Sequence, residues 1–77
     1  MTNNVPMNRL KEHRERAGIP QDELAKAARI TPTTISLIEN RHVAPMARTC
    51  RRIMDGFKAL EREQCLWDVF PAMKGKI

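Results

Sequence analysis

The sequence predicts a compact all-α domain of five short helices, and three observations support this fold class. Strand signals are poor, since the chain has no Tyr, little Val, no Asn-Gly or Asp-Gly dipeptide and no sustained polar alternation. Apolar residues instead recur at steps of three and four. The length of 77 residues fits one domain. We therefore expect a single domain over 1–77, with a flexible start at 1–6 and a tail at 74–77.

The first two predicted helices cover residues 7–17 and 21–28. Gly18 supplies the stop after the first, because glycine accepts the left-handed conformation that ends many helices. The second helix places Ala25 and Ala28 on a narrow apolar stripe. Since alanine side chains are small, we expect another helix to approach this stripe closely.

The third helix is predicted from Pro32 to about Asn40. Thr31 is a favourable N-cap, and proline suits the first helical position because its fixed φ matches the helix. Ile35 and Ile38 mark the side that faces the core. Only a few residues separate this helix from the second, a pattern typical of a helix-turn-helix.

Two further helices are predicted beyond Pro45. One carries apolar residues at helical spacing as far as Phe57, and the other covers about Glu61–Val69. The residues expected in the core are Leu10, Leu24, Ile30, Ile35, Ile38, Ile53, Met54 and Phe57.

Composition narrows the classes of function. The net charge of +5 favours an acidic partner, nucleic acid before a membrane. There is no long apolar run or signal-peptide pattern, so we expect a cytoplasmic protein with no membrane partner. Cys50 and Cys65 are expected to be reduced core thiols, and no metal or other cofactor is expected. Ser36 and His13 offer no nucleophile-base set with the carboxylates, so no catalytic residue and no enzyme is predicted.

The residues at 21–40 carry a resemblance to a known family. The runs Gln-Asp-Glu-Leu-Ala-Lys-Ala-Ala at 21–28 and Thr-Pro-Thr-Thr-Ile-Ser-Leu-Ile-Glu-Asn at 31–40 resemble the lambda-repressor-like (Cro/XRE) DNA-binding family. The resemblance implies a five-helix DNA-binding domain with a family-like core at 7–57 and the helix-turn-helix at its second and third helices. The resemblance ends at Phe57, and residues 58–73 are separately expected to form a C-terminal helix and a dimer segment.

The third helix is expected to read bases. In the resembled family its N-terminal part enters the major groove. A helical wheel, independent of the family, shows which side chains lie opposite Ile35 and Ile38. They are Thr33, Ser36, Leu37 and Asn40. Threonine and serine hydroxyls can serve either base and methyl groups can pack on thymine, so modest direct readout is expected. The expected base contacts are Thr33, Ser36, Leu37, Thr34 and Pro32.

Phosphate contacts are expected on either side of that helix. Between Glu39 and Asp55 the chain has several arginines and no acid. Two of these arginines are four residues apart and form an exposed basic ridge, for which the alternative is a merely solvated face. The family places further contacts at the start of the second helix and the end of the third. The expected phosphate contacts are Gln21, Asn40, Arg41, Arg48 and Arg52.

Other positions are interpreted as architecture. The resemblance implies a structural ion pair between Arg14 and Glu39. Arg29 stands where the family's turn usually has glycine, so a left-handed backbone there costs on the order of 1 kcal/mol. Pro20 replaces the usual N-cap hydroxyl of the second helix. His13 is expected to pack, with a pH switch as the alternative.

The C-terminal third is predicted to make a homodimer. It holds the only Trp and one of the two Phe residues, more apolar surface than a short final helix needs for its own core. The alternative is a helix that simply closes the monomer core. The expected interface residues are Leu66, Trp67, Val69, Phe70 and Met73.

Two functional interpretations follow. The first is a sequence-specific transcriptional regulator that binds a palindromic double-stranded DNA operator as a dimer. Its types are a phage repressor or Cro-like protein, a restriction-modification controller or an antitoxin, all prokaryotic or phage-encoded. The alternative is a protein-interaction module of the same fold that binds a toxin or another regulator, supported by the sparse base-reading chemistry of the third helix.

Overall fold

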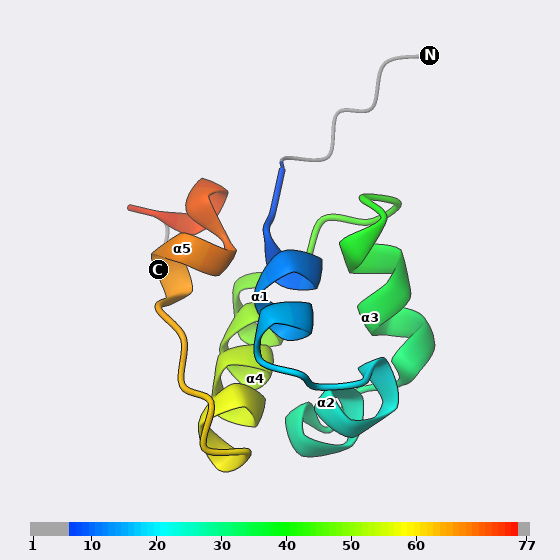
Figure 1. Ribbon diagram of the computed structural model, residues 1–77. Coiled ribbons are helices and arrows are strands. Elements are labelled where there is room, and N and C mark those ends of the chain that lie inside the picture. The colour runs from blue at the N-terminus through cyan, green and yellow to red at the C-terminus, as the bar shows by residue number, and fades with distance from the viewer. Residues whose placement is uncertain (1–6, 76–77) are drawn as a thin grey trace.

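Five α-helices make up the part of the chain that the computed structural model describes, residues 7–75 (Figure 1). A 3₁₀ turn follows the last helix, and no strand occurs in this range, so the predicted all-α fold is confirmed. The expectations for residues 1–6 and for 76–77 lie outside the described residues. The elements are α1 (Leu10–Arg16), α2 (Gln21–Ala28), α3 (Pro32–Glu39), α4 (Ala47–Ala59), α5 (Leu66–Val69) and the turn Pro71–Met73.

The helix α2 lies at the centre of the packing. It contacts both α3 and α4, while α1 packs against α3 and α5 packs against α4. In Figure 1, α3 and α5 stand on opposite sides of the molecule with α1 and α4 between them. The Cα radius of gyration is 11.4 Å, and the longest dimension is 35 Å. The helix-turn-helix is therefore held from behind by α1 and α4.

The expected close approach to α2 is made by α4. A Cβ built on Gly56 of α4 would lie 3.0 Å from the backbone nitrogen of Ala28 and 3.1 Å from its Cβ. Any larger residue at this position would require the two helices to move apart by a few tenths of an ångström. The sequence analysis identified the alanine stripe but missed Gly56 as its partner.

Four helices end with the same backbone arrangement. Beyond each helix one residue has a positive φ: it is 62° at Arg29, directly after α2. It is 74° at Gly18, 59° at Arg41 and 57° at Glu61, each the second residue after its helix. In each case the next N–H donates to the carbonyl five residues earlier, as in the 2.9 Å bond from Ile30 to Ala25. Gly18 is thus the predicted stop, and Arg29 has the left-handed backbone considered for it.

The first helix begins three residues later than predicted. Asn8 Oδ1 accepts the N–H of Leu10 at 3.0 Å, and the N–H of Arg9 donates to the carbonyl of Val69 at 2.8 Å. These bonds hold Asn8 and Arg9 in a non-helical segment that precedes α1. The segment connects α1 to the end of α5 and does not form the first turn of α1.

The predicted helix at Glu61–Val69 is wrong over its first half. Glu61 takes the left-handed conformation that ends α4, and the N–H of Arg62 donates to the carbonyl of Phe57 at 2.8 Å. Helical structure resumes only at Leu66. The polar residues at 61–65 therefore form a connection to a helix of a single turn.

The core prediction is largely confirmed. Ile30 and Met54 are only partly buried, and the other six expected residues are buried. Cys50 is fully buried, and burial raises the pKa of its thiol to about 11. Cys65 is exposed, so its assignment to the core is wrong. The buried apolar residues that the sequence analysis did not list as core are Ile19, Ala25, Ala28, Val69 and Phe70.

Candidate nucleic-acid interface

The helix α3 begins with the N-cap that the sequence predicts. Thr31 Oγ1 accepts the N–H of Thr34 at 3.1 Å, and Pro32 occupies the first turn. Ile35 and Ile38 are buried against the rest of the domain. This anchoring fixes which side of α3 faces outward.

The outward side of α3 carries three exposed residues. Pro32 and Thr33 are exposed, and Leu37 is 37 % exposed. Thr34 and Ser36, also expected to contact bases, are half-buried. The expected base-contact residues thus share one helix, but only Pro32, Thr33 and Leu37 are exposed.

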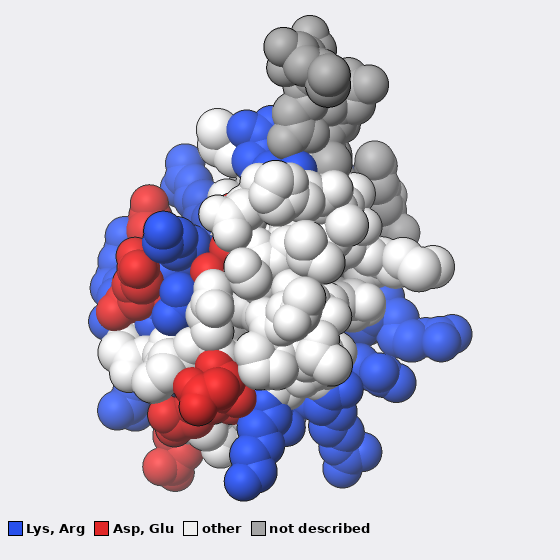
Figure 2. Space-filling model, turned by 90° about the vertical axis from the view of Figure 1, so that its right-hand side faces the viewer, with Lys and Arg blue, Asp and Glu red and all other residues white. Residues whose placement is uncertain are grey.

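The surface around α3 is uncharged at its centre. Figure 2 views this side of the molecule and shows a broad area without Lys, Arg, Asp or Glu, with charged side chains gathered at its margins. The α3 sequence agrees, because Glu39 is its only charged residue. A surface of this kind offers hydrogen bonds and apolar contacts at its centre and charge at its rim.

The expected phosphate-contact residues lie in three places. Gln21 is half-buried at the start of α2, and Asn40 with Arg41 follows the end of α3. Asn40 is exposed, and its Nδ2 donates to the carbonyl of Ser36 at 2.9 Å. Arg41 is half-buried. Since Gln21 Nε2 donates to Glu39, the last residue of α3, all three residues gather at the C-terminal end of this helix.

Two more expected phosphate contacts lie on α4. Arg48 and Arg52 are exposed, and together with Arg51 and Asp55 they line a shallow hollow. Arg52 comes four positions after Arg48, which places the two side chains on one side of the helix. They form the basic ridge that the sequence predicts.

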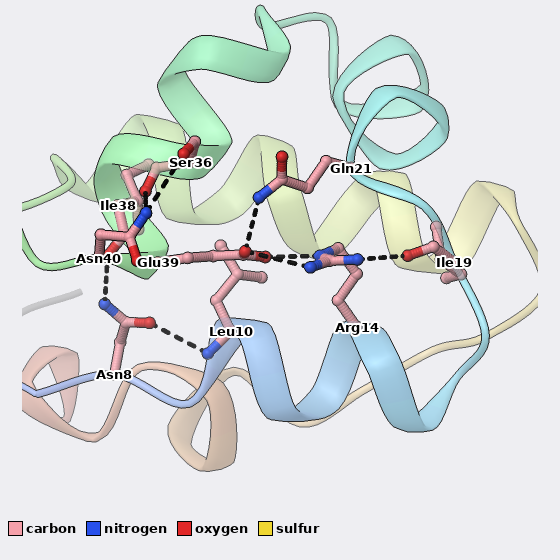
Figure 3. A network of polar contacts seen from close by, with 9 residues as sticks. All are labelled: Asn8, Leu10, Arg14, Ile19, Gln21, Ser36, Ile38, Glu39 and Asn40. Atoms are coloured by element: carbon pink, nitrogen blue, oxygen red, sulfur yellow. Dashed lines mark hydrogen bonds and ion pairs between the residues drawn. The ribbon is translucent and has the colours of Figure 1, made fainter.

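A buried ion pair ties α1 to the end of α3, as Figure 3 shows. Arg14 Nε donates to Glu39 Oε2 at 2.5 Å, and Arg14 Nη2 donates to Oε1 at 3.2 Å. The two side chains are only 9 % and 1 % exposed. The hydrogen bond to Glu39 raises the pKa of Arg14, although burial opposes it. The ion pair expected from the resemblance is therefore present.

The same carboxylate also holds a candidate DNA contact. Gln21 Nε2 donates to Glu39 Oε1 at 2.9 Å (Figure 3). The remaining guanidinium nitrogen of Arg14, Nη1, donates to the carbonyl of Ile19 at 2.8 Å, in the turn between α1 and α2. One network thus fixes the end of α3, the start of α2 and the turn before it.

Asn8 is a second link that sequence reasoning missed. Its Nδ2 donates to the carbonyl of Ile38 at 3.0 Å, while its Oδ1 caps the first N–H of α1 (Figure 3). Asparagine is a common capping residue, which is the signal that could have found it. Asn8 therefore fastens the C-terminal end of α3 to α1.

The expected dimer residues divide into two groups. Val69 and Phe70 are buried in the monomer core, at 0 % and 2 % exposure, so neither has surface to offer a second copy. Their assignment to an interface is corrected, because they close the core of one domain. Trp67 is 36 % exposed, and Leu66 and Met73 are partly buried.

His13 is buried and packs as expected. Its Nδ1 lies 2.9 Å from Gln64 Oε1, and Gln64 Nε2 donates to the carbonyl of Arg62. The histidine thus holds the connection between α4 and α5 against α1. Within residues 7–75, no group of three His, Cys, Asp or Glu residues is arranged to hold a metal ion. None of the helices described there is long and apolar enough to cross a membrane.

A family model described as helix-turn-helix, of the Cro/C1 type, matches residues 10–62. The match spans α1 to α4 and therefore includes α2, α3 and the Arg14–Glu39 pair. Neither the curated proteins nor the solved structures that were searched contain a match.

Proposed function

Because the chain belongs to the Cro/C1-type helix-turn-helix family of DNA-binding regulators, we propose that it binds double-stranded DNA sequence-specifically, with α3 in the major groove. The observation that carries the proposal is the orientation of α3. Ile35 and Ile38 face inward, whereas Thr33 and Leu37 face outward on an uncharged surface. The major groove is about 12 Å wide and admits one α-helix.

Phosphate contacts are assigned to the rim of this surface. Gln21, Asn40 and Arg41 gather at the C-terminal end of α3, and Arg48 and Arg52 are exposed on α4. Glu39 accepts one N–H of the Gln21 amide, which leaves the second N–H for a phosphate oxygen. Contacts of this kind position a protein on the duplex without reading its sequence.

Full recognition of an operator requires two copies. Each copy has one recognition helix, α3, whereas a palindromic operator presents two half-sites about 34 Å apart from centre to centre. One copy therefore covers one half-site, and a palindromic operator suits a homodimer. Of the residues expected at the interface, Trp67, Leu66 and Met73 retain exposed surface for this role.

The biological role proposed is control of transcription by occupancy of an operator. The family consists of non-enzymatic regulators. Repressors of phage or Cro type, controllers of restriction-modification genes and antitoxins share this mode of action, which operates in the cytoplasm of a prokaryote.

The second candidate is a protein-interaction module that binds a toxin or another regulator. It is favoured by the lack of charged residues in α3 before Glu39 and by the exposure of two large apolar side chains, Leu37 and Trp67. Such side chains are typical anchors of protein interfaces.

A DNA titration separates these functions. The protein is titrated with the DNA upstream of its own coding sequence and with a scrambled duplex, at two salt concentrations. DNA binding predicts tighter binding to the first duplex and an affinity that falls with salt. The same affinity for both duplexes under every condition favours the interaction module.

Variants assign the contacts within this titration. The double variant Arg48→Ala and Arg52→Ala should weaken binding to all duplexes and reduce the salt slope by about 2. Lys74→Ala is a control for removal of a single exposed cation, because this lysine follows the turn Pro71–Met73, outside the expected contacts. Thr33→Ala should change sequence preference instead. A salt slope that the double variant leaves unchanged would remove the ridge from the interface.

A further inference from the structure

Most polar side chains of α3 are occupied within the protein. The hydroxyls of Thr31 and Thr34 lie 2.8 Å apart and hydrogen-bond to each other. Ser36 Oγ accepts a bond from Asn40 Nδ2 at 3.2 Å. These groups contribute to holding the helix, and their geometry is fixed before any ligand arrives.

The exposed side of α3 presents methyl and methylene groups with one free hydroxyl. Among the described residues, no partner is found for the hydroxyl of Thr33, which is exposed. Leu37 lies four residues later, at helical neighbour spacing, and is 37 % exposed. Pro32, also exposed, precedes them. We call Pro32, Thr33 and Leu37 the methyl face.

The methyl face is suited to one feature of the major groove. Thymine presents a C5-methyl group there, whereas guanine presents two acceptors that an apolar surface would leave unpaired. A threonine hydroxyl both donates and accepts, so it can pair with O4 of thymine or with the N4 amino group of cytosine. The methyl face should thus distinguish bases by the presence of a C5-methyl group more than by their hydrogen-bonding groups.

Building on the proposed function, we infer that the methyl face reads the C5-methyl groups of pyrimidines. Thr33 and Leu37 are the specificity-determining residues, and Pro32 widens the apolar contact. The half-site therefore contains thymine opposite this face, and 5-methylcytosine is accepted there in preference to cytosine. The protein is in this way sensitive to cytosine methylation of its site.

The test varies only the methyl group. Duplexes of 20 base pairs are selected from a random pool with the full chain, and the most enriched duplex is resynthesised. A set of duplexes is made in which each thymine of a half-site is kept or is replaced by uracil, cytosine or 5-methylcytosine, one position at a time. Loss of one contacted methyl should weaken binding about fourfold. We expect that loss for uracil, and tighter binding of 5-methylcytosine than of cytosine.

Leu37→Ala then tests the residue. This variant should bind the thymine and uracil duplexes with nearly equal affinity at one position. Met46→Ala is the control, because this methionine is apolar and 75 % exposed but lies outside α3. It should leave the thymine-to-uracil ratio unchanged. Circular dichroism checks that each variant is folded.

The outcomes separate this inference from the function on which it rests. If a duplex is selected and bound, but uracil replaces thymine everywhere without loss, the inference is overturned and DNA binding stands. A ratio that is lost equally in Leu37→Ala and Met46→Ala also overturns it. If no duplex is enriched from the pool, sequence-specific binding fails, and this inference fails with it.

Discussion

Gly56 and Ala28 bring the backbones of α4 and α2 into direct contact. A Cβ at Gly56 would stand 3.0 Å from the nitrogen of Ala28 and 3.2 Å from its Cα, closer than side chains normally approach. Since α2 in turn packs against α3, this contact sets how deeply the helix-turn-helix is seated on the rest of the domain.

Substitution of Gly56 by alanine should therefore destabilise the protein. In an open helix the change would be favourable, because alanine has the higher helix propensity. Here the new methyl group would lie 3.0–3.2 Å from the backbone and Cβ of Ala28, so the two helices must shift apart. Overpacking of this kind costs about 1–3 kcal/mol in the free energy of unfolding. Urea denaturation measures the change. Asp55→Ala, at the exposed neighbouring position, is the control and should stay within about 0.5 kcal/mol. A Gly56→Ala protein as stable as the wild type would contradict this packing.

Two ion pairs among the described residues, one buried and one exposed, should differ in their contribution to stability. Glu39→Gln leaves the buried Arg14 guanidinium without its counter-charge, so the unfolding free energy should fall by about 3 kcal/mol. Glu12→Gln breaks the Glu12–Arg16 pair, whose side chains are 53 % and 69 % exposed. That loss should be at most about 1 kcal/mol because water screens the pair. Thermal unfolding of both variants makes the comparison, and equal losses would show that the Arg14 pair is not protected from solvent.

The left-handed helix ends predict a pair of changes with opposite sign. Arg29 has a φ of 62°, so Arg29→Gly should relieve strain and stabilise the domain by about 1 kcal/mol. Gly18 has a φ of 74° and open space around its Cα, so Gly18→Ala should destabilise it by a similar amount through the backbone alone. Guanidinium denaturation of the two variants tests both signs, and a destabilised Arg29→Gly protein would count against strain at that turn.

The buried thiol predicts a loss of stability in alkali. Burial raises the pKa of Cys50 to about 11 from an ordinary value of 9.0. The protonated Cys50 thiol therefore makes its full contribution to the unfolding free energy below pH 9. This contribution is lost as the pH rises through about 11, because the thiol of the unfolded chain releases its proton at a lower pH than that of the folded protein. The unfolding free energy measured at pH 8 and pH 10.5 should fall less in Cys50→Ala than in the wild type. Cys65→Ala, at the exposed cysteine, should retain the wild-type slope. Identical slopes in all three proteins would exclude this role of Cys50.

The structure could be predicted from the sequence where neighbouring residues alone determine it. Thr31 and Pro32 define the start of α3 by capping and by a fixed φ, and both act within one turn of the chain. The orientation of α3 follows from Ile35 and Ile38, since helical periodicity places them on one side. The helix-turn-helix could therefore be predicted from short-range chemistry.

Prediction failed where a distant contact decides the structure. Asn8 and Arg9 read as a first helical turn, but bonds to Ile38 and Val69 draw them out of it. Val69 and Phe70 looked like surplus apolar surface, whereas the short α5 uses them to close the core. The capping preference of asparagine could have placed Asn8 before the helix, but the distant partners of these residues have no signature in the neighbouring sequence.

The two residues before α1 join parts of the molecule that are otherwise on opposite sides. Through Asn8 the end of α3 is bound to α1, and through Arg9 the last residue of α5 is bound to the same segment. Release of this dipeptide would free both ends together, so they belong to one cooperative opening unit in hydrogen exchange. A ligand that protects the amides of α3 from exchange should consequently slow exchange near Val69 as well, without touching it.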